Sequence, residues 1–188
     1  VRNQTAESMA ANDLATWFME LVTRTRVPSP FEPSAGLVRM FAAIRVDQRR
    51  AVQPDVLPYL HERPDLVAAT VGNPRLRAGM VTRPGLAALL SAHPNLAREL
   101  ATVETDPLLA DHAATLVKYP ETAAALENDA ALRRQAVSAL GLVDVLGGDL
   151  TLLRAVGNNL WLELALTELP QLAEVVRTAD APLAVIRE

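Results

Sequence analysis

The chain has 188 residues, half of them hydrophobic but only 4% aromatic, and its formal net charge is −4. It contains no cysteine, which excludes disulfides, zinc–thiolate sites and iron–sulfur clusters. No apolar run approaches the length of a membrane span, and the Leu- and Ala-rich composition favours packed helices over a sheet.

The first segment, residues 6–26, has the hydrophobic spacing of an amphipathic helix. Within it Trp17, Phe18 and Met19 are consecutive, so they cannot all face the same side of that helix. We expect Met19 to be either covered by another element or exposed to a partner. Residues 27–33 contain three prolines and are expected to form an extended connector.

A second helix is predicted over about 35–50, with Ser34 as its N-cap. Its end is basic at Arg45, Arg49 and Arg50, and cations near a helix C-terminus are favourable even without a ligand. The candidate interaction surface predicted from the sequence consists of six residues: Trp17, Phe18, Met19, Arg45, Arg49 and Arg50.

Five prolines then follow at intervals of ten residues: Pro54, Pro64, Pro74, Pro84 and Pro94. Proline suits the first position of a helix, and it pushes the residue before it towards an extended conformation. The positions two and six residues after each proline share one helical face and are apolar in nearly every unit. Each unit therefore predicts about two helical turns, and helices this short are stable only when they are stacked.

The pattern weakens after the fifth proline but continues. Pro107 and Pro120 each begin a further unit, and a proline-free helix capped by Asn128 or Asp129 follows. Beyond a turn at Gly147 and Gly148, where Asp149 is expected to cap the next helix, two helices are predicted at about 149–156 and 158–169. Two more units begin at Pro170 and Pro182.

These elements predict an all-α fold: a stack of short Pro-initiated helices, α-solenoid-like or an irregular helical bundle, with longer helices at both ends. We divide the chain into residues 1–34 (amphipathic helix and connector), 35–140 (helical repeats) and 141–188 (acidic helical segment expected to pack on the repeats). Residues 1–100 carry a net charge of +3 and residues 101–188 one of −7. Because the chain starts without methionine and stops inside a unit, we expect it to be part of a larger polypeptide.

Residues 73–100, NPRLRAGMVTRPGLAALLSAHPNLAREL, resemble the Pro/Leu short-helix repeats of leucine-rich-repeat-variant proteins. They also resemble Ala/Leu/Pro-rich helical segments of very large secreted or injected actinobacterial proteins, including polymorphic toxins. The resemblance covers about residues 54–140, although the ten-residue unit is shorter than the two-helix unit of the variant repeats. It implies a packing or binding module of a larger bacterial machine, associated with a toxin domain, and it carries over no catalytic residue.

No motif identifies an active site. None of the three histidines is spaced for a helical metal site, and the Gly147–Gly148 turn lacks the lysine and the strand of a phosphate loop. A catalytic alternative uses scattered residues: Asp111, His112, Arg133 and Glu163. We expect neither a metal nor another cofactor.

The sequence favours a non-catalytic scaffold or protein–protein interaction module of a larger bacterial protein. The alternatives are a toxin- or effector-associated or delivery domain that engages membranes around Trp161, or an enzyme with an unrecognised site. The expected partner is another protein or another domain of the same polypeptide. A nucleic acid is not expected, because the basic residues form no clustered stripe. The compartment stays open between the bacterial cytoplasm and a secreted or injected protein.

Overall fold

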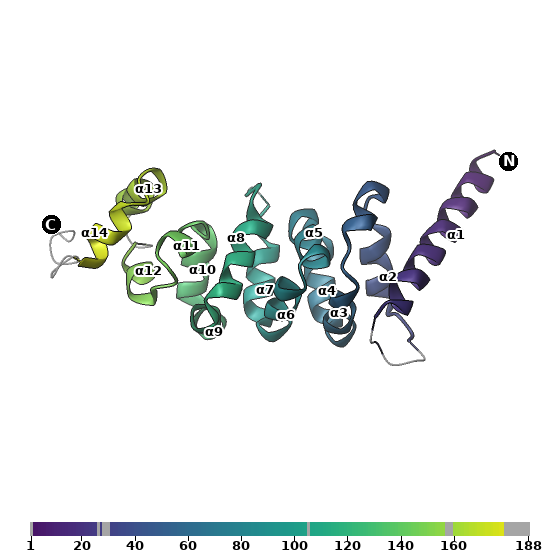
Figure 1. Cartoon of the computed structure of the whole chain (residues 1–188), viewed down its shortest axis with the longest axis horizontal. Coiled ribbons are helices and arrows are strands. Elements are labelled where there is room, and N and C mark those ends of the chain that lie inside the picture. Colours follow the sequence, from purple (N-terminus) through teal and green to yellow (C-terminus); the bar gives the residue numbers. More distant parts are fainter. Residues whose placement is uncertain (1, 26, 28–30, 105, 157–159, 179–188) are drawn as a thin grey trace.

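The computed structural model describes residues 2–25, 27, 31–104, 106–156 and 160–178. Every regular element within these ranges is a helix, which confirms the predicted all-α class. The molecule is an elongated stack of short helices, with the long helix α1 (Arg2–Thr23) projecting at one end (Figure 1).

Four consecutive helices begin at the prolines of the ten-residue units: α4 (Pro64–Val71), α5 (Pro74–Thr82), α6 (Pro84–Ala92) and α7 (Pro94–Ala101). The unit at Pro54 begins as a 3₁₀ turn, η2 (Pro54–Val56), and continues as α3 (Leu57–Glu62). In all four helices the positions two and six after the proline are buried, as their spacing predicts. Thr70 is the one polar side chain among them, and its hydroxyl donates to the carbonyl of Leu66 at 2.9 Å.

The remaining helices are α8 (Leu109–Thr115), η3 (Leu116–Lys118), α9 (Pro120–Asn128), α10 (Ala130–Ser138), α11 (Leu142–Val145), α12 (Leu150–Val156), α13 (Leu160–Glu168) and α14 (Leu172–Thr178). Asp129 and Asp149 accept hydrogen bonds from the first backbone N–H groups of α10 and α12, and so act as caps. The C-terminal helices are not longer than those of the stack: α13 has nine residues, as α5 has. The unit predicted at Pro182 and the first two residues of the helix predicted over 158–169 lie outside the described residues.

Within the repeats, each of five helices packs against the helix three places further along the chain: α3, α4, α5, α7 and α8. One row contains α4, α7 and α10, a second contains α5, α8 and α11, and a third begins with α3 and α6. Helix α2 (Ala35–Ala42) packs on α4 at one end, while α12 and α13 continue the first and second rows at the other. The stack therefore advances by three helices per turn, and the ten-residue unit of the sequence is one third of a structural turn (Figure 1).

The prediction of one helix over 35–50 is wrong in its second half. Helix α2 ends at Ala42, Arg45 is extended with φ −61° and ψ 147°, and the chain resumes as a 3₁₀ helix, η1 (Val46–Ala51). Ile44 is buried in the core, and none of the residues of η1 is fully buried. Arg45, Arg49 and Arg50 therefore lie on a short surface 3₁₀ turn instead of the basic end of one long helix.

A single hydrophobic core runs along the stack from Leu21 of α1 to Ala173 of α14. Gly147 and Gly148 interrupt it with positive φ angles of 62° and 72°, conformations that glycine adopts without strain. A Cβ atom on Gly148 would lie 2.6 Å from the ring of Tyr119, so this turn also needs glycine for its close approach to the preceding turn. The chain continues through this turn into α12, which packs on α10.

Candidate interaction surface

The three large residues of α1 divide between the core and solvent. The rings of Trp17 and Phe18 lie 5.8 and 5.4 Å from the ring of Phe41 in α2, which anchors α1 to the stack. Met19 is 58% exposed. It lines a small apolar groove of about 280 Å³ with Leu14 of α1 and Val38 of α2.

Arg49 and Arg50 lie against the opposite side of α1. The guanidinium carbon of Arg49 is 5.3 Å from the centre of the Trp17 ring, a cation–π contact. The two arginines, Arg24 and Glu20 line a hollow of about 310 Å³ whose base includes Trp17. The Nε atom of Arg49 is buried with no hydrogen-bond partner among the described residues.

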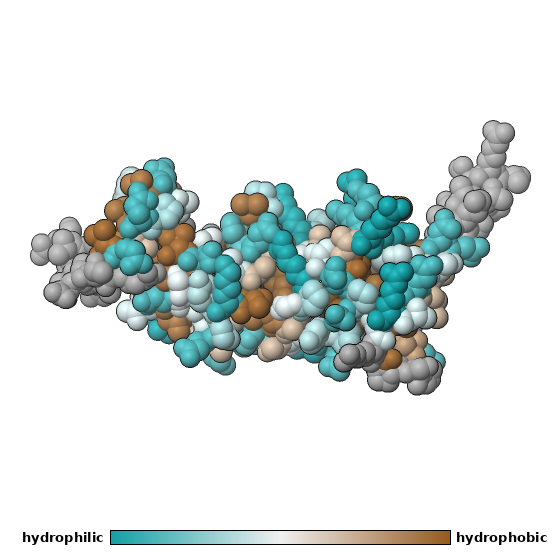
Figure 2. Space-filling model, viewed as in Figure 1, coloured by the Kyte–Doolittle hydropathy of each residue, from teal (hydrophilic) through white to brown (hydrophobic). Residues whose placement is uncertain are grey.

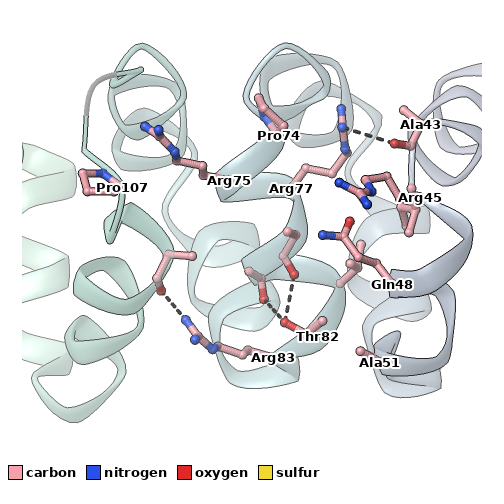
Figure 3. A pocket seen from close by; sticks show the side chains of 15 residues that line it. Ala43, Arg45, Gln48, Ala51, Pro74, Arg75, Arg77, Thr82, Arg83 and Pro107 are labelled. Atoms are coloured by element: carbon pink, nitrogen blue, oxygen red, sulfur yellow. Dashed lines mark hydrogen bonds between the residues drawn. The ribbon is translucent and has the colours of Figure 1, made fainter.

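Arg45 lies beside a second, larger hollow of about 560 Å³, on the other side of η1. This hollow extends from η1 across α5 to the start of α8 (Figure 3). The Arg45 side chain is 75% exposed and pairs with Asp47 at 3.1 Å. The structure thus distributes the six predicted residues over three neighbouring depressions, with α1 and η1 forming the walls between them.

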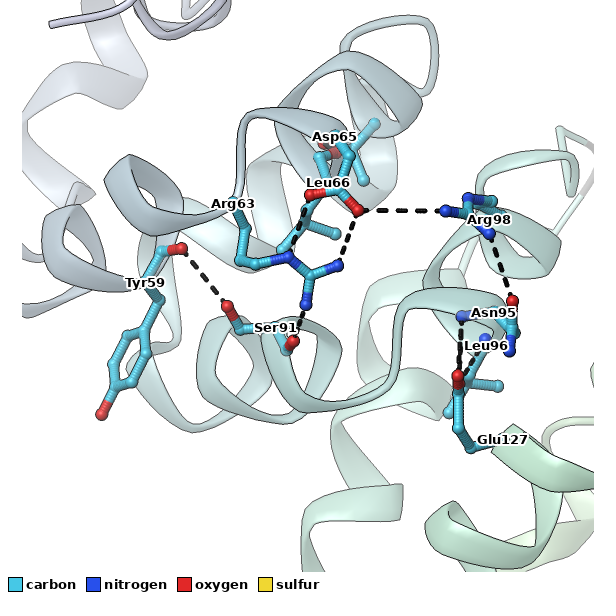
Figure 4. Close-up of polar contacts among 10 residues, drawn as sticks. Tyr59, Arg63, Asp65, Leu66, Ser91, Asn95, Leu96, Arg98 and Glu127 are labelled. Carbon is cyan, nitrogen blue, oxygen red and sulfur yellow. Dashed lines mark hydrogen bonds and ion pairs between the residues drawn. The ribbon is translucent and has the colours of Figure 1, made fainter.

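Four of the residues that directly precede a proline link successive turns of the stack, a role that we had not predicted from the sequence: Arg63, Asn73, Arg83 and Tyr119. Arg63 donates to the carbonyl of Ser91 and to the carboxylate of Asp65, which pairs with it at 2.6 Å (Figure 4). Arg83 donates to the carbonyl of Ala110 at 2.6 Å and also pairs with Asp111. In each case the acceptor carbonyl lies one turn further along the stack.

Asn73 and Tyr119 repeat this arrangement. The amide nitrogen of Asn73 donates to the carbonyl of Val103 at 2.8 Å, and the hydroxyl of Tyr119 contacts a carboxylate oxygen of Asp144 at 3.2 Å. The physical reason is local: a residue before proline is held out of the helical region, so its side chain leaves the helix towards the next turn. The sequence signal for the links at Arg63, Asn73 and Arg83 is a polar residue directly before a proline, at ten-residue spacing. The signal is incomplete, because Gln53 bonds to the nearby carbonyl of Ala51 and Nδ1 of His93 has no hydrogen-bond partner among the described residues.

The link between Arg63 and Asp65 also affects ionisation. The guanidinium hydrogen bond lowers the pKa of Asp65 to about 2 and raises the pKa of Arg63. Arg98 lies 4.0 Å from the same carboxylate, and Glu127 accepts from the backbone N–H groups of Asn95 and Leu96 (Figure 4). These charged groups serve the contacts between neighbouring turns.

The residues of the catalytic alternative are not brought together. Asp111 pairs with Arg83, whereas Nδ1 of the adjacent His112 lies 2.9 Å from a carboxylate oxygen of Asp106. Arg133 pairs with Glu99 at 3.6 Å and donates to two backbone carbonyls. The side chain of Glu163 lies outside the described part of the molecule.

The Asp106–His112 pair borders a hollow of about 670 Å³ that also includes Ser138. The hydroxyl of Ser138 donates to the carbonyl of Gln135 at 2.7 Å. A Cβ atom on Gly141 would lie 3.3 Å from Nε2 of His112, so the free nitrogen of the ring faces the backbone of α11. The pair therefore connects the start of α8 to the next turn, and Asp106 additionally accepts from the N–H of Leu108.

Among the described residues, no group of three or more His, Asp or Glu side chains is arranged to hold a metal ion. In the same part of the chain, no helix combines the length and the hydrophobicity needed to cross a bilayer. Figure 2 shows exposed hydrophobic residues over α13, where Trp161 is 80% and Leu164 48% exposed.

Comparison with known proteins identifies no relative of this chain, so a proposed function depends on the geometry described above. The chain matches no protein-family model, and no curated protein or solved structure gives a significant match.

Proposed function

We propose that this protein is a non-catalytic helical scaffold, an interaction module of a larger bacterial protein that binds another protein. The observation that carries the proposal is the use of the polar side chains. Arg63, Asn73 and Arg83 donate side-chain hydrogen bonds to carbonyls of the next turn, which is a structural role. Side chains outside these links, Met19, Arg49 and Arg50 among them, line the depressions beside α1 and η1.

The composition of these depressions supports a protein partner. An exposed methionine, a tryptophan and several arginines occur within the same surface, and these residue types are enriched in the centres of protein interfaces. Met19 and Arg50 are both exposed, and neither side chain forms a hydrogen bond or an ion pair with another turn among the described residues. They can be changed without disturbing the stack.

The test compares the wild-type protein with Arg50→Glu and Met19→Asp, and with two controls: Arg134→Glu, which changes an exposed arginine of α10, and His112→Ala. Each protein is immobilised, exposed to lysate of the source organism, and the recovered material is quantified; light scattering then measures the mass of the complex. We expect the wild type, Arg134→Glu and His112→Ala to recover one protein stoichiometrically, and Arg50→Glu and Met19→Asp to lose it. Equal recovery by every variant, or none by the wild type, would refute the proposal.

The second candidate is an enzyme whose general base is His112, oriented by Asp106. The 2.9 Å contact between Nδ1 and the carboxylate favours it, because this arrangement leaves Nε2 as the nitrogen that would accept a proton. The nearness of Nε2 to Gly141 disfavours it. A hydrolase screen with the wild type and His112→Ala separates the two candidates, since only an enzyme loses turnover in the variant.

A further inference from the structure

The hollow over α5 lies mainly in the basic half of the stack. Its floor consists of small residues, Ala78 and Gly79 of α5 and Ala110 of α8, and its volume is about 560 Å³. That volume falls in the range of ordinary ligand sites and accommodates a few residues of an extended chain. Four arginines surround the floor: Arg45, Arg75, Arg77 and Arg83 (Figure 3).

Close packing of α5 on α8 requires small residues at this position, which leaves the floor of the hollow without large side chains. A Cβ atom on Gly79 would lie 2.5 Å from the Cβ of Ala110, closer than two carbon atoms can approach. Gly79 is therefore needed for these helices to meet, and no side chain of its own projects into the depression. The result is a shallow apolar floor under a basic rim.

The charge of the rim is not balanced within the hollow. No aspartate or glutamate is among the residues that line it. Arg75 donates to the carbonyls of Glu104 and Asp106, and Arg77 donates to those of Val71 and Ala43. Neither arginine forms an ion pair with any carboxylate among the described residues.

Arg77 is the more desolvated of these two cations, and burial lowers its pKa. A partly buried cation whose partners are only carbonyl dipoles gains from an anion placed beside it. The guanidinium group has five N–H donors in a planar fork, and the two carbonyls use two of them. Donors therefore remain for a ligand.

The other two arginines already have carboxylate partners, at the outer edge of the hollow. Arg45 pairs with Asp47, and Arg83 pairs with Asp111; both acidic side chains are more than half exposed, at 63% and 57%. Exposed pairs of this kind contribute little free energy, so an incoming carboxylate can compete for the arginine at small cost.

We propose that the hollow over α5 binds an extended acidic segment of a partner protein, with carboxylates on Arg75 and Arg77 and small apolar side chains on the floor. The inference rests on the proposed interaction function and specifies the chemistry of the partner. Alternate side chains of an extended peptide point in opposite directions, so an alternating acidic and small-apolar sequence presents one kind to the rim and the other to the floor. A peptide is favoured over a nucleic acid because the chain as a whole is acidic, with a pI of about 5.4, and would repel a long polyanion.

The test uses a fluorescently labelled peptide of about eight residues that alternates glutamate with alanine. Its binding to the full chain is measured by fluorescence anisotropy, against a peptide with glutamine in place of glutamate and a single-stranded oligonucleotide of similar charge. The protein variants are Arg75→Gln, Arg77→Gln and Arg45→Glu, with Arg134→Gln on α10 as the control for loss of one positive charge. Thermal melting of each variant reports on folding.

We expect the glutamate peptide to bind, the glutamine peptide not to bind, and each of Arg75→Gln and Arg77→Gln to weaken binding about tenfold, the effect of losing one charge-assisted hydrogen bond. Arg134→Gln should leave binding unchanged. Because the hydrogen bonds and the ion pair of the Arg45 side chain among the described residues are all with Asp47, Arg45→Glu should weaken binding while leaving the melting temperature as in the wild type.

Three outcomes would overturn the inference: equal binding of the two peptides, an equal loss in Arg134→Gln, or tighter binding of the oligonucleotide than of the acidic peptide. Failure here is distinguishable from failure of the proposed function. If the acidic peptide does not bind but a partner is still recovered in an Arg50-dependent manner, the proposed interaction function is supported. Only the proposal that the hollow over α5 binds an acidic segment is then refuted.

Discussion

Replacing Asn73 tests whether the residues before the prolines connect the turns of the stack. Asn73 is 3% exposed and forms two kinds of hydrogen bond. Its side-chain oxygen accepts from the N–H of Leu76 at 3.0 Å and so caps α5. Its amide nitrogen donates to the carbonyls of Val103 at 2.8 Å and Ala101 at 3.3 Å in the next turn.

The expected cost of Asn73→Ala follows from these contacts. Loss of an N-cap costs about 1 kcal/mol. Loss of the donor leaves one well-aligned and one long hydrogen bond unmade at partly buried carbonyls, which adds about 1–2 kcal/mol. The free energy of unfolding should therefore fall by about 2–3 kcal/mol, which lowers the melting temperature by about 5–10 °C in a chain of this size.

The assay is urea and thermal unfolding followed by helical circular dichroism, with two comparison variants. Ser34→Ala removes a cap on α2 whose only side-chain hydrogen bond is to Leu37 N, so it should cost about 1 kcal/mol. Asn73→Asp preserves the cap but turns an oxygen towards the two carbonyls, so it should cost at least as much as Asn73→Ala. If Asn73→Asp is as stable as the wild type, the inter-turn hydrogen bonds contribute nothing and the reasoning is refuted.

Three further variants test the packing and the ion pairs. Gly79→Ala should destabilise the stack by about 1–3 kcal/mol, because α5 and α8 must separate to admit the Cβ. Gly72→Ala should stabilise it by about 0.4–1 kcal/mol, because a Cβ there meets nothing within 4 Å. Urea titrations of the two variants must give changes in the free energy of unfolding of opposite sign. Leu86→Asp places a charge at a position that is 1% exposed and should abolish cooperative melting; a folded variant would contradict the buried register of α6. Because Arg63 lowers the pKa of Asp65 to about 2, the stability from this pair is present above about pH 4 and is lost as the pH falls towards 2. The urea midpoints of Asp65→Asn and the wild type should converge over that interval, and a constant difference would exclude the pair as the cause.

Most of the individual helices could be predicted from the sequence because their signals are local. Proline at the first helical position determines where α4 to α7 begin, and the spacing of Leu66, Leu76, Leu86 and Leu96 identifies the buried face. The prediction failed over 35–50, where intrinsic helix propensity was outweighed by the burial of Ile44 in the core.

The candidate surface could be predicted only in part. The aromatic cluster on α1 and the arginines of η1 are visible as unusual residues, but the contact between Trp17 and Arg49 joins segments separated by the connector. Nothing in the sequence distinguishes Arg75 and Arg77 from the other arginines of the chain. Their place beside a hollow depends on η1 and α8, which reach α5 from opposite directions along the stack.

By itself the sequence determined an all-α chain of short helices, many of them begun by a proline and with an apolar face, because capping and helical periodicity act over fewer than ten residues. The tertiary structure decided that three such helices make one turn, because that arrangement depends on contacts between residues about thirty positions apart, such as Asn73 with Val103. It also decided where the surface is hollow: the depression over α5 exists because Gly79 lets α8 approach, and no local pattern specifies that contact.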